Sequence, residues 1–166
     1  MVDNYTNVNK QTLLSFPYKY IIDTCSILSQ KPDRAHRRKV YNSLWKKIDE
    51  FVKEKYIVIC SEINDELEDD DMKQWVKQHN CVVIGIDYDI QRNVIKIVNE
   101  HPDMIDFKNV KSSGDAFIIA TAIKYSLTVI TEENKDASKK IHKICASYNI
   151  KSLNITELAD EENWSF

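Results

Sequence analysis

Short apolar runs rich in β-branched residues alternate along the chain with longer segments in which apolar residues recur every three or four positions. Runs of the first kind are typical of buried strands, and segments of the second kind are typical of amphipathic helices. The pattern predicts strands over 20–22, 57–60, 128–130 and 150–153, while 82–86 fits either a strand or a buried connection.

The helical pattern predicts a helix between each pair of these runs. The predicted helices cover residues 40–55, a segment that begins at Ser61, and residues 72–78, 90–98, 113–123 and 137–147. The helix that opens at Ser113-Gly114 is apolar on nearly all sides, which indicates that it is buried. Because parallel strands need crossover helices, the alternation predicts an α/β fold, a three-layer α/β/α arrangement around a mostly parallel central sheet.

The chain has the length and composition of one globular domain. Its 166 residues include 43% hydrophobic and 30% charged side chains, and residues 1–18 form a polar leader that ends near Pro17. We therefore expect a single domain over residues 19–166. With only two glycines, Gly85 and Gly114, the chain has no Walker loop and no G-x-G-x-x-G fingerprint.

Charge and cysteine usage exclude further classes of protein. The net charge is −3, so any affinity for nucleic acid has to come from a local patch. No apolar stretch is long enough for a membrane span, and we expect a soluble, cytoplasmic protein. The four cysteines lack zinc-ligand spacing, and we assign no catalytic role to the scattered histidines, which are His36, His79, His101 and His142.

Acidic residues follow the predicted strands or open the predicted helices in turn. They are Asp23, then Glu62 or Glu66, then Asp115, then Glu132 or Glu133. In open parallel sheets, functional sites form beyond the carboxyl ends of the strands, so four carboxylates are expected to converge there. Clustered carboxylates raise one another's pKa, and a divalent cation with a preference for oxygen ligands, Mg²⁺ or Mn²⁺, relieves that repulsion. Such a metal centre is suited to hydrolysis of a phosphodiester.

Each acid alone also has an ordinary explanation. Asp23 is able to cap the turn after its strand, and Asp115 is favoured by the dipole in the first turn of its helix, where Ser112 precedes it as in a capping box. Glu62 and Glu66 belong to an acidic run, which is most often a solvated face. The order of the acids and their common edge favour the metal site over four independent coincidences.

Four segments resemble the PIN domain superfamily, in order and over nearly the whole chain. They are YIIDTCSIL from Tyr20, EINDEL from Glu62, SSGDAFIIATAI from Ser112 and TVITEEN from Thr128. The acidic helix followed by a segment with Trp75 is similar to a PIN-like branch related to the VapC-type toxin ribonucleases. The resemblance implies a metal-dependent endoribonuclease that uses Mg²⁺ or Mn²⁺ and leaves a 5′-phosphate.

The resemblance also implies roles for individual residues. It transfers the catalytic positions to Asp23, Glu66, Asp115 and Glu133. Glu62 lies one turn before Glu66 on the same helix face, and Glu132 adjoins Glu133, so each pair offers two candidate metal ligands. The fourth position usually carries Asp, and here it carries Glu. Small hydroxyl side chains are implied to orient the carboxylates or the metal's water molecules, namely those of Thr24, Ser26 and Thr131.

A basic segment supplies the candidate contact with RNA. Residues 31–47 hold seven Lys or Arg against one acid, Asp33. We expect RNA phosphates to bind at Arg34, Arg37, Arg38 and Lys39. A solvated helix face and a surface for an acidic partner protein are the alternatives. Single-stranded or looped RNA is the favoured substrate because in-line attack needs an accessible backbone.

The resemblance leaves the wider context open. We expect the protein to be the toxin of a toxin-antitoxin pair, in which case an antitoxin would bind near the carboxylate edge and block metal or RNA. A homodimer is a further expectation. The alternative is a catalytically impaired PIN-like module that binds RNA or a protein, because Glu replaces Asp at the fourth position. A phosphoacceptor domain is excluded, since it needs an acidic pair after the first strand and this strand ends Ile21-Ile22-Asp23.

Overall fold

The computed structural model describes residues 16–104, 114–133 and 141–166. Within these ranges, parallel strands form one sheet of five in the order β3-β2-β1-β4-β5. The strands are β1 (Tyr20–Ile22), β2 (Ile57–Cys60), β3 (Val82–Ile84), β4 (Thr128–Ile130) and β5 (Ser152–Leu153). The predicted strands are therefore present, and the ambiguous run at 82–86 is a strand over its first three residues.

The first strand lies at the centre of the sheet. Tyr20 pairs with Ile57 on one side and with Thr128 on the other. Every residue of β1 and β2 is buried, which explains why both read as unbroken apolar runs rather than as alternating ones. All five strands point the same way, so their carboxyl ends share one edge of the sheet.

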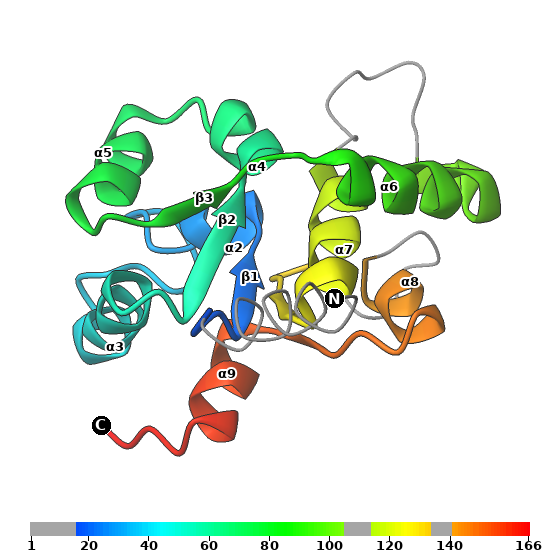
Figure 1. Cartoon of the computed structure of the whole chain (residues 1–166). Coiled ribbons are helices and arrows are strands. Elements are labelled where there is room, and N and C mark those ends of the chain that lie inside the picture. Colours follow the sequence, from blue (N-terminus) through cyan, green and yellow to red (C-terminus); the bar gives the residue numbers. More distant parts are fainter. Residues whose placement is uncertain (1–15, 105–113, 134–140) are drawn as a thin grey trace, which may run out of the picture.

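Helices cover both faces of the sheet (Figure 1). They are α2 (Thr24–Leu28), α3 (Asn42–Lys53), α4 (Ser61–Glu66), α5 (Asp70–Gln78), α6 (Tyr88–Glu100), the 3₁₀ turn η1 (Pro102–Met104), α7 (Gly114–Tyr125), α8 (Ile141–Ser147) and α9 (Ile155–Glu161). Figure 1 shows α3 and α5 on one side of the sheet and α6, α7 and α8 on the other. The predicted three-layer α/β/α architecture is confirmed.

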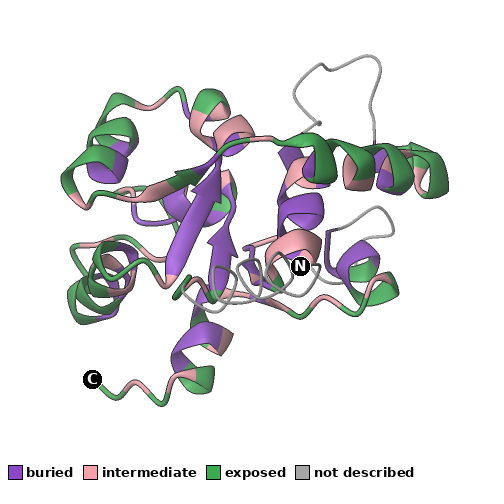
Figure 2. Cartoon of the chain, in the orientation of Figure 1, coloured by how far each residue is buried: buried purple, intermediate pink, exposed green. Residues whose placement is uncertain are grey.

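The core covers both faces of the sheet, and a large part of it lies between the sheet and α7. This helix packs against β1, β2 and β4, and α6 lies along its outer side. Seven of its twelve residues are buried, in agreement with its nearly all-apolar sequence. Figure 2 shows β1, β2 and α7 largely in purple, with exposed residues in green on the outer sides of α3, α5 and α6.

Several local predictions need correction. The polar turn predicted after β1 is the short helix α2, and the helix predicted to start at Val40 starts at Asn42 after a series of turns. The acidic C-terminal segment after 153, for which no helix was predicted, forms α9, which begins with a capping box between Asn154 and Glu157. The first fifteen residues of the predicted leader, the positions 137–140 and Ser112 lie outside the described residues.

No helix in the described ranges has both the length and the apolar character that a bilayer crossing requires.

Candidate acidic site at the carboxyl edge of the sheet

Four acidic residues from different elements lie at one end of the molecule. Asp23 directly follows β1, Glu66 ends α4, Asp115 is the second residue of α7, and Glu133 follows β4. Figure 1 shows α4 and the start of α7 at the end of the sheet toward which the arrowheads of β1 and β2 point. The fold therefore places the acids near the edge at which convergence was predicted.

Asp23 is the most deeply buried of the four, with 4% of its surface exposed. Its Oδ1 accepts a hydrogen bond of 2.8 Å from the Ser26 backbone N–H, and its Oδ2 accepts one from the Thr131 hydroxyl. Burial raises the pKa of Asp23 to about 6; these hydrogen bonds oppose the rise and the charge of Glu133 adds to it. Asp23 is thus both the N-cap of α2, as its ordinary explanation states, and a member of the acidic group.

The pKa of Asp115 is raised even further than that of Asp23. Burial is the largest cause, followed by the charges of Glu133, Asp23 and Glu66, and together they bring its pKa to about 7. Asp115 therefore lies within electrostatic reach of each of the other three acids.

Glu66 rests directly against the start of α7. A Cβ atom added at Gly114 would lie 2.4 Å from Glu66 Oε1 and 2.6 Å from Oε2, so only glycine allows the carboxylate this position. The Gly114 backbone N–H donates a hydrogen bond to Glu66. Burial raises the pKa of Glu66, and Glu62 and Asp23 raise it further. Of the two candidates on this helix, Glu66 is the one held beside Asp115.

The two adjacent glutamates after β4 have different surroundings. Glu132 Oε1 accepts a hydrogen bond of 2.7 Å from the Ile155 N–H at the start of α9, and its Oε2 lies 3.7 Å from His36 Nδ1. Glu133 instead raises the pKa of both Asp23 and Asp115. The carboxylate of Glu132 is engaged in capping α9, and Glu133 is the member of the pair that acts on the acidic group.

A thiol beside these carboxylates responds to the same charges. Burial raises the pKa of Cys25 to about 11, with further contributions from Asp23, Glu133 and Asp115. The Cys25 sulfur atom is therefore close enough to Asp23, Glu133 and Asp115 for the charge of each to affect it. This agrees with the convergence inferred from the carboxylates themselves.

The donor chemistry fits a hard divalent cation, although a finished ligand cage is not formed. Carboxylate oxygens are the ligands that Mg²⁺ and Mn²⁺ prefer. Thr24 Oγ1, next to Asp23, is buried and has no hydrogen-bond partner among the described residues. Yet no three His, Cys, Asp or Glu residues in the described ranges are gathered closely enough to hold an ion. The acids are electrostatic neighbours whose side chains are not drawn together into a coordination shell.

Comparison with protein families assigns this chain to one family. The family model described as Domain of unknown function (DUF4411) matches residues 20–166, which include all four acids. The chain belongs to the DUF4411 family. No curated protein sequence matches it.

A solved structure gives the fold of this DUF4411 chain an independent reference. The crystal structure of FitAcB from Neisseria gonorrhoeae is similar with a TM-score of 0.51 and 16% sequence identity, over 82% of this chain and 98% of that one. At this level of identity the likeness concerns the fold alone. It agrees with the PIN-like α/β/α architecture expected from the sequence.

The predicted RNA contacts of the DUF4411 chain divide into two kinds. Arg38 is bound within the fold: its guanidinium forms hydrogen bonds of 2.7 and 2.9 Å with Asp49, and two more with Gln30. Arg34, Arg37 and Lys39 are exposed. They lie on turns that precede α3 rather than on a helix face, so the exposed basic surface is smaller than the sequence suggested.

An open pocket connects the acidic site with this basic segment. It has a volume of about 410 Å³ and its lining residues are Thr24, Leu28, Lys31, Arg34, Glu66, Leu67, Glu68 and Asp69. Lys31 forms an ion pair with Asp69, and the side chain of Arg34 is 58% exposed. The pocket thus extends from Glu66 to an exposed guanidinium.

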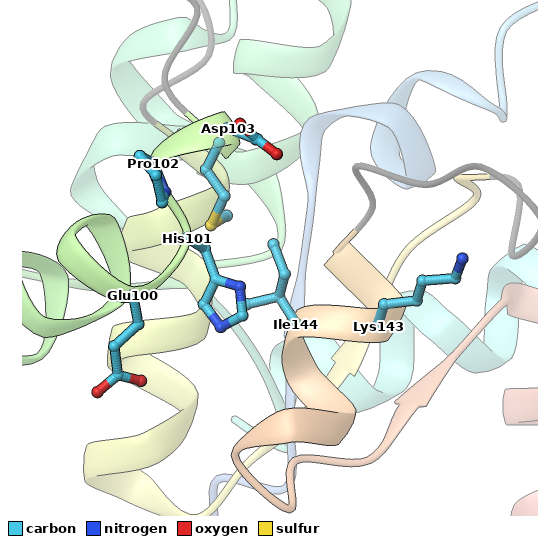
Figure 3. A pocket seen from close by; sticks show the side chains of 7 residues that line it. Glu100, His101, Pro102, Asp103, Lys143 and Ile144 are labelled. Carbon is cyan, nitrogen blue, oxygen red and sulfur yellow. The ribbon is translucent and has the colours of Figure 1, made fainter.

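A smaller pocket of about 190 Å³ lies between the end of α6, η1 and α8 (Figure 3). Glu100, His101, Asp103 and Lys143 bring charges of both signs to its lining. None of the predicted site residues lines it.

Sequence reasoning missed two residues that support the acidic site. Gly114 was noted as one of only two glycines and as part of the start of the buried helix, but its place directly before Asp115, which was the available signal, was given no role in the site. His142 was assigned no role, and it is buried with its Nε2 3.1 Å from the Glu133 carbonyl oxygen. No local motif marks His142, because it meets Glu133 only through the packing of α8.

Proposed function

We propose that this DUF4411 chain is a metal-dependent endoribonuclease that hydrolyses RNA phosphodiester bonds at the acidic site. The observation that carries the proposal is the position of Asp115, whose pKa of about 7 reflects burial together with the charges of Glu133, Asp23 and Glu66. A protein retains a buried, mutually repelling set of carboxylates at a cost in stability, and binding of a cation is the usual compensation.

Asp23, Glu66, Asp115 and Glu133 would hold one or two Mg²⁺ or Mn²⁺ ions. A bound ion of this kind would supply a nucleophilic hydroxide and would stabilise the negative charge that develops on the phosphoryl oxygens. The Ser26 backbone N–H and the Thr131 hydroxyl hold the two oxygens of Asp23. The Thr24 hydroxyl, which has no hydrogen-bond partner among the described residues, would be available to orient a water ligand of the ion. The chain's own contribution is to keep these oxygen atoms in place.

The proposed substrate is single-stranded or looped RNA. The pocket beside Glu66 leads to Arg34, and Arg37 and Lys39 are exposed nearby. Guanidinium and ammonium groups in this position attract the phosphates that flank a scissile bond without reading the bases. Cleavage is proposed to leave a 5′-phosphate.

We further propose an antitoxin protein as partner and a toxin role within a toxin-antitoxin pair. The PIN-like fold and the open pocket that Glu66 lines at the carboxylate edge support this proposal. Co-expression with the product of a neighbouring gene, followed by co-purification and a cleavage assay, tests it. Loss of cleavage in the complex is expected, and a free, active protein in the presence of that product would contradict the proposed antitoxin.

Sedimentation of the isolated chain tests the proposed homodimer.

The nuclease assignment is tested with labelled RNA in Mg²⁺, Mn²⁺ or EDTA. Wild-type protein is expected to cleave in either metal and not in EDTA, while Asp115→Asn reduces the rate at least 100-fold. Asp65→Asn is the matched control, because Asp65 is an exposed acid on the same helix as Glu66. Equal rates for Asp115→Asn and wild type would exclude the proposed site.

The competing function is a catalytically impaired module that binds RNA or a protein. Glu in the fourth acidic position favours it, as does the lack of a gathered group of three ligands in the described residues. Calorimetric titration with Mn²⁺ separates the two functions. The nuclease binds the ion and loses binding in Asp23→Asn, whereas the impaired module binds RNA equally in Mn²⁺ and EDTA.

A further inference from the structure

His142 connects α8 and β5 to the backbone of Glu133. Its side chain is 8% exposed, with Nδ1 2.6 Å from the Ser152 hydroxyl and Nε2 3.1 Å from the Glu133 carbonyl oxygen. A carbonyl oxygen only accepts hydrogen bonds, so Nε2 carries a proton and donates. In the neutral ring, Nδ1 then accepts a hydrogen bond from the Ser152 hydroxyl. The imidazole is held at both nitrogens and is fixed in orientation.

The amide on the other side of Glu133 is held as well. The Glu133 N–H donates a hydrogen bond of 3.2 Å to Thr131 Oγ1, and the Thr131 hydroxyl donates to Asp23. The Thr131 N–H in turn donates to the Leu153 carbonyl, which ties this segment to β5. Both backbone polar groups of Glu133 therefore have partners. The N–H is connected to Asp23 through Thr131, and the carbonyl oxygen is connected to Ser152 through His142.

This arrangement matters because Glu133 lies beyond the end of β4 and outside any helix or strand. A glutamate side chain has three rotatable bonds, and each bond spreads the positions that the carboxylate samples. Fixing the peptide groups on both sides of Cα reduces that spread. The longer side chain at a position that usually carries aspartate makes a fixed backbone more important here.

We propose that His142 is a positioning residue, which holds the Glu133 carbonyl so that the Glu133 carboxylate stays directed at Asp23 and Asp115. This inference rests on the proposed function, because it assigns His142 a part in assembling that same cation site. His142 does not touch the reacting atoms in this scheme. It acts through the backbone of Glu133.

Two substitutions separate positioning from simple packing. In His142→Gln the side-chain amide reaches as far as Nε2 and is able to donate to the Glu133 carbonyl. In His142→Asn the shorter amide occupies the place of Nδ1, which keeps the Ser152 contact and loses the Glu133 contact. Both variants lose the imidazole ring, so a role in packing alone predicts similar defects in the two.

The experiment measures Mn²⁺ affinity by calorimetry and amide hydrogen exchange over residues 131–133, on the full chain. His142→Asn is expected to bind Mn²⁺ about tenfold more weakly and to exchange faster, while His142→Gln stays within about threefold of wild type in both. Equal affinities in all three proteins, or equal losses in both variants, would overturn the positioning role. If wild type binds no Mn²⁺, the proposed function itself is overturned, and the role of His142 with it.

Discussion

Asp115 makes the stability of the protein depend on pH. Its pKa is about 7 in the folded chain against 3.8 as the ordinary value. The folded state therefore disfavours the charged form, so the stability contribution is complete below pH 3.8 and is lost as the pH rises through 7. Asp23, with a pKa of about 6, acts in the same direction. The burial of these two carboxylates, together with the charges of the neighbouring acids, therefore destabilises the metal-free protein at neutral and alkaline pH.

Asp115→Asn should therefore stabilise the metal-free protein at pH 8. Asparagine removes the buried charge, and we expect a gain of roughly 1–2 kcal/mol, or about 2–6 °C in Tm. At pH 4 the gain should disappear, because wild-type Asp115 is then largely protonated. Thermal unfolding in EDTA at both pH values measures the effect, with Asp65→Asn as the control. A lower Tm for Asp115→Asn at pH 8 would show that the carboxylate stabilises the fold instead.

Gly114→Ala tests whether Glu66 has to lie against the start of α7. The added methyl group would meet the end of a flexible side chain, so Glu66 moves aside and the fold remains within about 1 kcal/mol of wild type. The displaced carboxylate should lower Mn²⁺ affinity about tenfold. Gly85→Ala is the control, since no atom lies within 4 Å of its added Cβ. Unchanged Mn²⁺ affinity in Gly114→Ala would remove Glu66 from the ligand set.

Among the helices, those with long periodic segments were predictable, whereas the short helices α2 and α9 were not. The burial of α7 followed from its composition, because a helix that is apolar on nearly all sides has no face for solvent. In contrast, α2 has five residues, which is too short to show a helical period. The α9 segment carries several acids that obscured Ile155 and Leu158, although the Asn154 and Glu157 pair was a readable start signal.

Asn154→Ala should destabilise α9 and leave the acidic site intact. The Asn154 side chain accepts a hydrogen bond of 2.8 Å from the Glu157 N–H, and loss of such an N-cap costs about 1 kcal/mol. We expect Tm to fall by about 2–4 °C with unchanged Mn²⁺ affinity. Asn154→Asp, which keeps a capping oxygen, should retain the wild-type Tm. A loss of Mn²⁺ affinity in Asn154→Ala would mean that α9 supports the site through Glu132.

At the scale of the whole molecule, the convergence of acids was predictable because every strand runs in one direction. Strand ends of a parallel sheet meet at one edge, so residues that follow β1 and β4 had to become neighbours. The resemblance favoured Glu66 and Glu133, yet the spacing of the acids left Glu62 and Glu132 open as ligands. What distinguishes the members of each pair is the N–H of Ile155, which engages Glu132, and the space left by Gly114, which admits Glu66. Both are tertiary contacts between segments distant in sequence.

The sequence also could not show which basic residues of the segment 31–47 are exposed, because its seven positive side chains have different surroundings. Asp49 accepts hydrogen bonds from Arg38 and from the Trp75 indole N–H, and Arg38 also lies over the Trp45 ring. The Arg38 guanidinium lowers the pKa of Asp49, although burial opposes this. This network joins α3 and α5 on one face of the sheet, so Arg38 is a structural residue. Arg37, next to it in sequence, is exposed.

Arg37→Gln and Arg38→Gln should therefore affect different properties of the protein, RNA binding in the first case and stability in the second. Arg38→Gln leaves the half-buried carboxylate of Asp49 without its main partner and should lower the free energy of unfolding by about 2 kcal/mol. Arg37→Gln should leave stability unchanged, weaken RNA binding and reduce the slope of log affinity against log salt by about one, as expected for one lost phosphate contact. Denaturant unfolding and RNA binding at several salt concentrations, with an uncleaved RNA in EDTA, measure both properties. If Arg38→Gln weakens RNA binding as strongly as Arg37→Gln at unchanged stability, the two arginines share one surface and the basic segment contacts RNA as a whole.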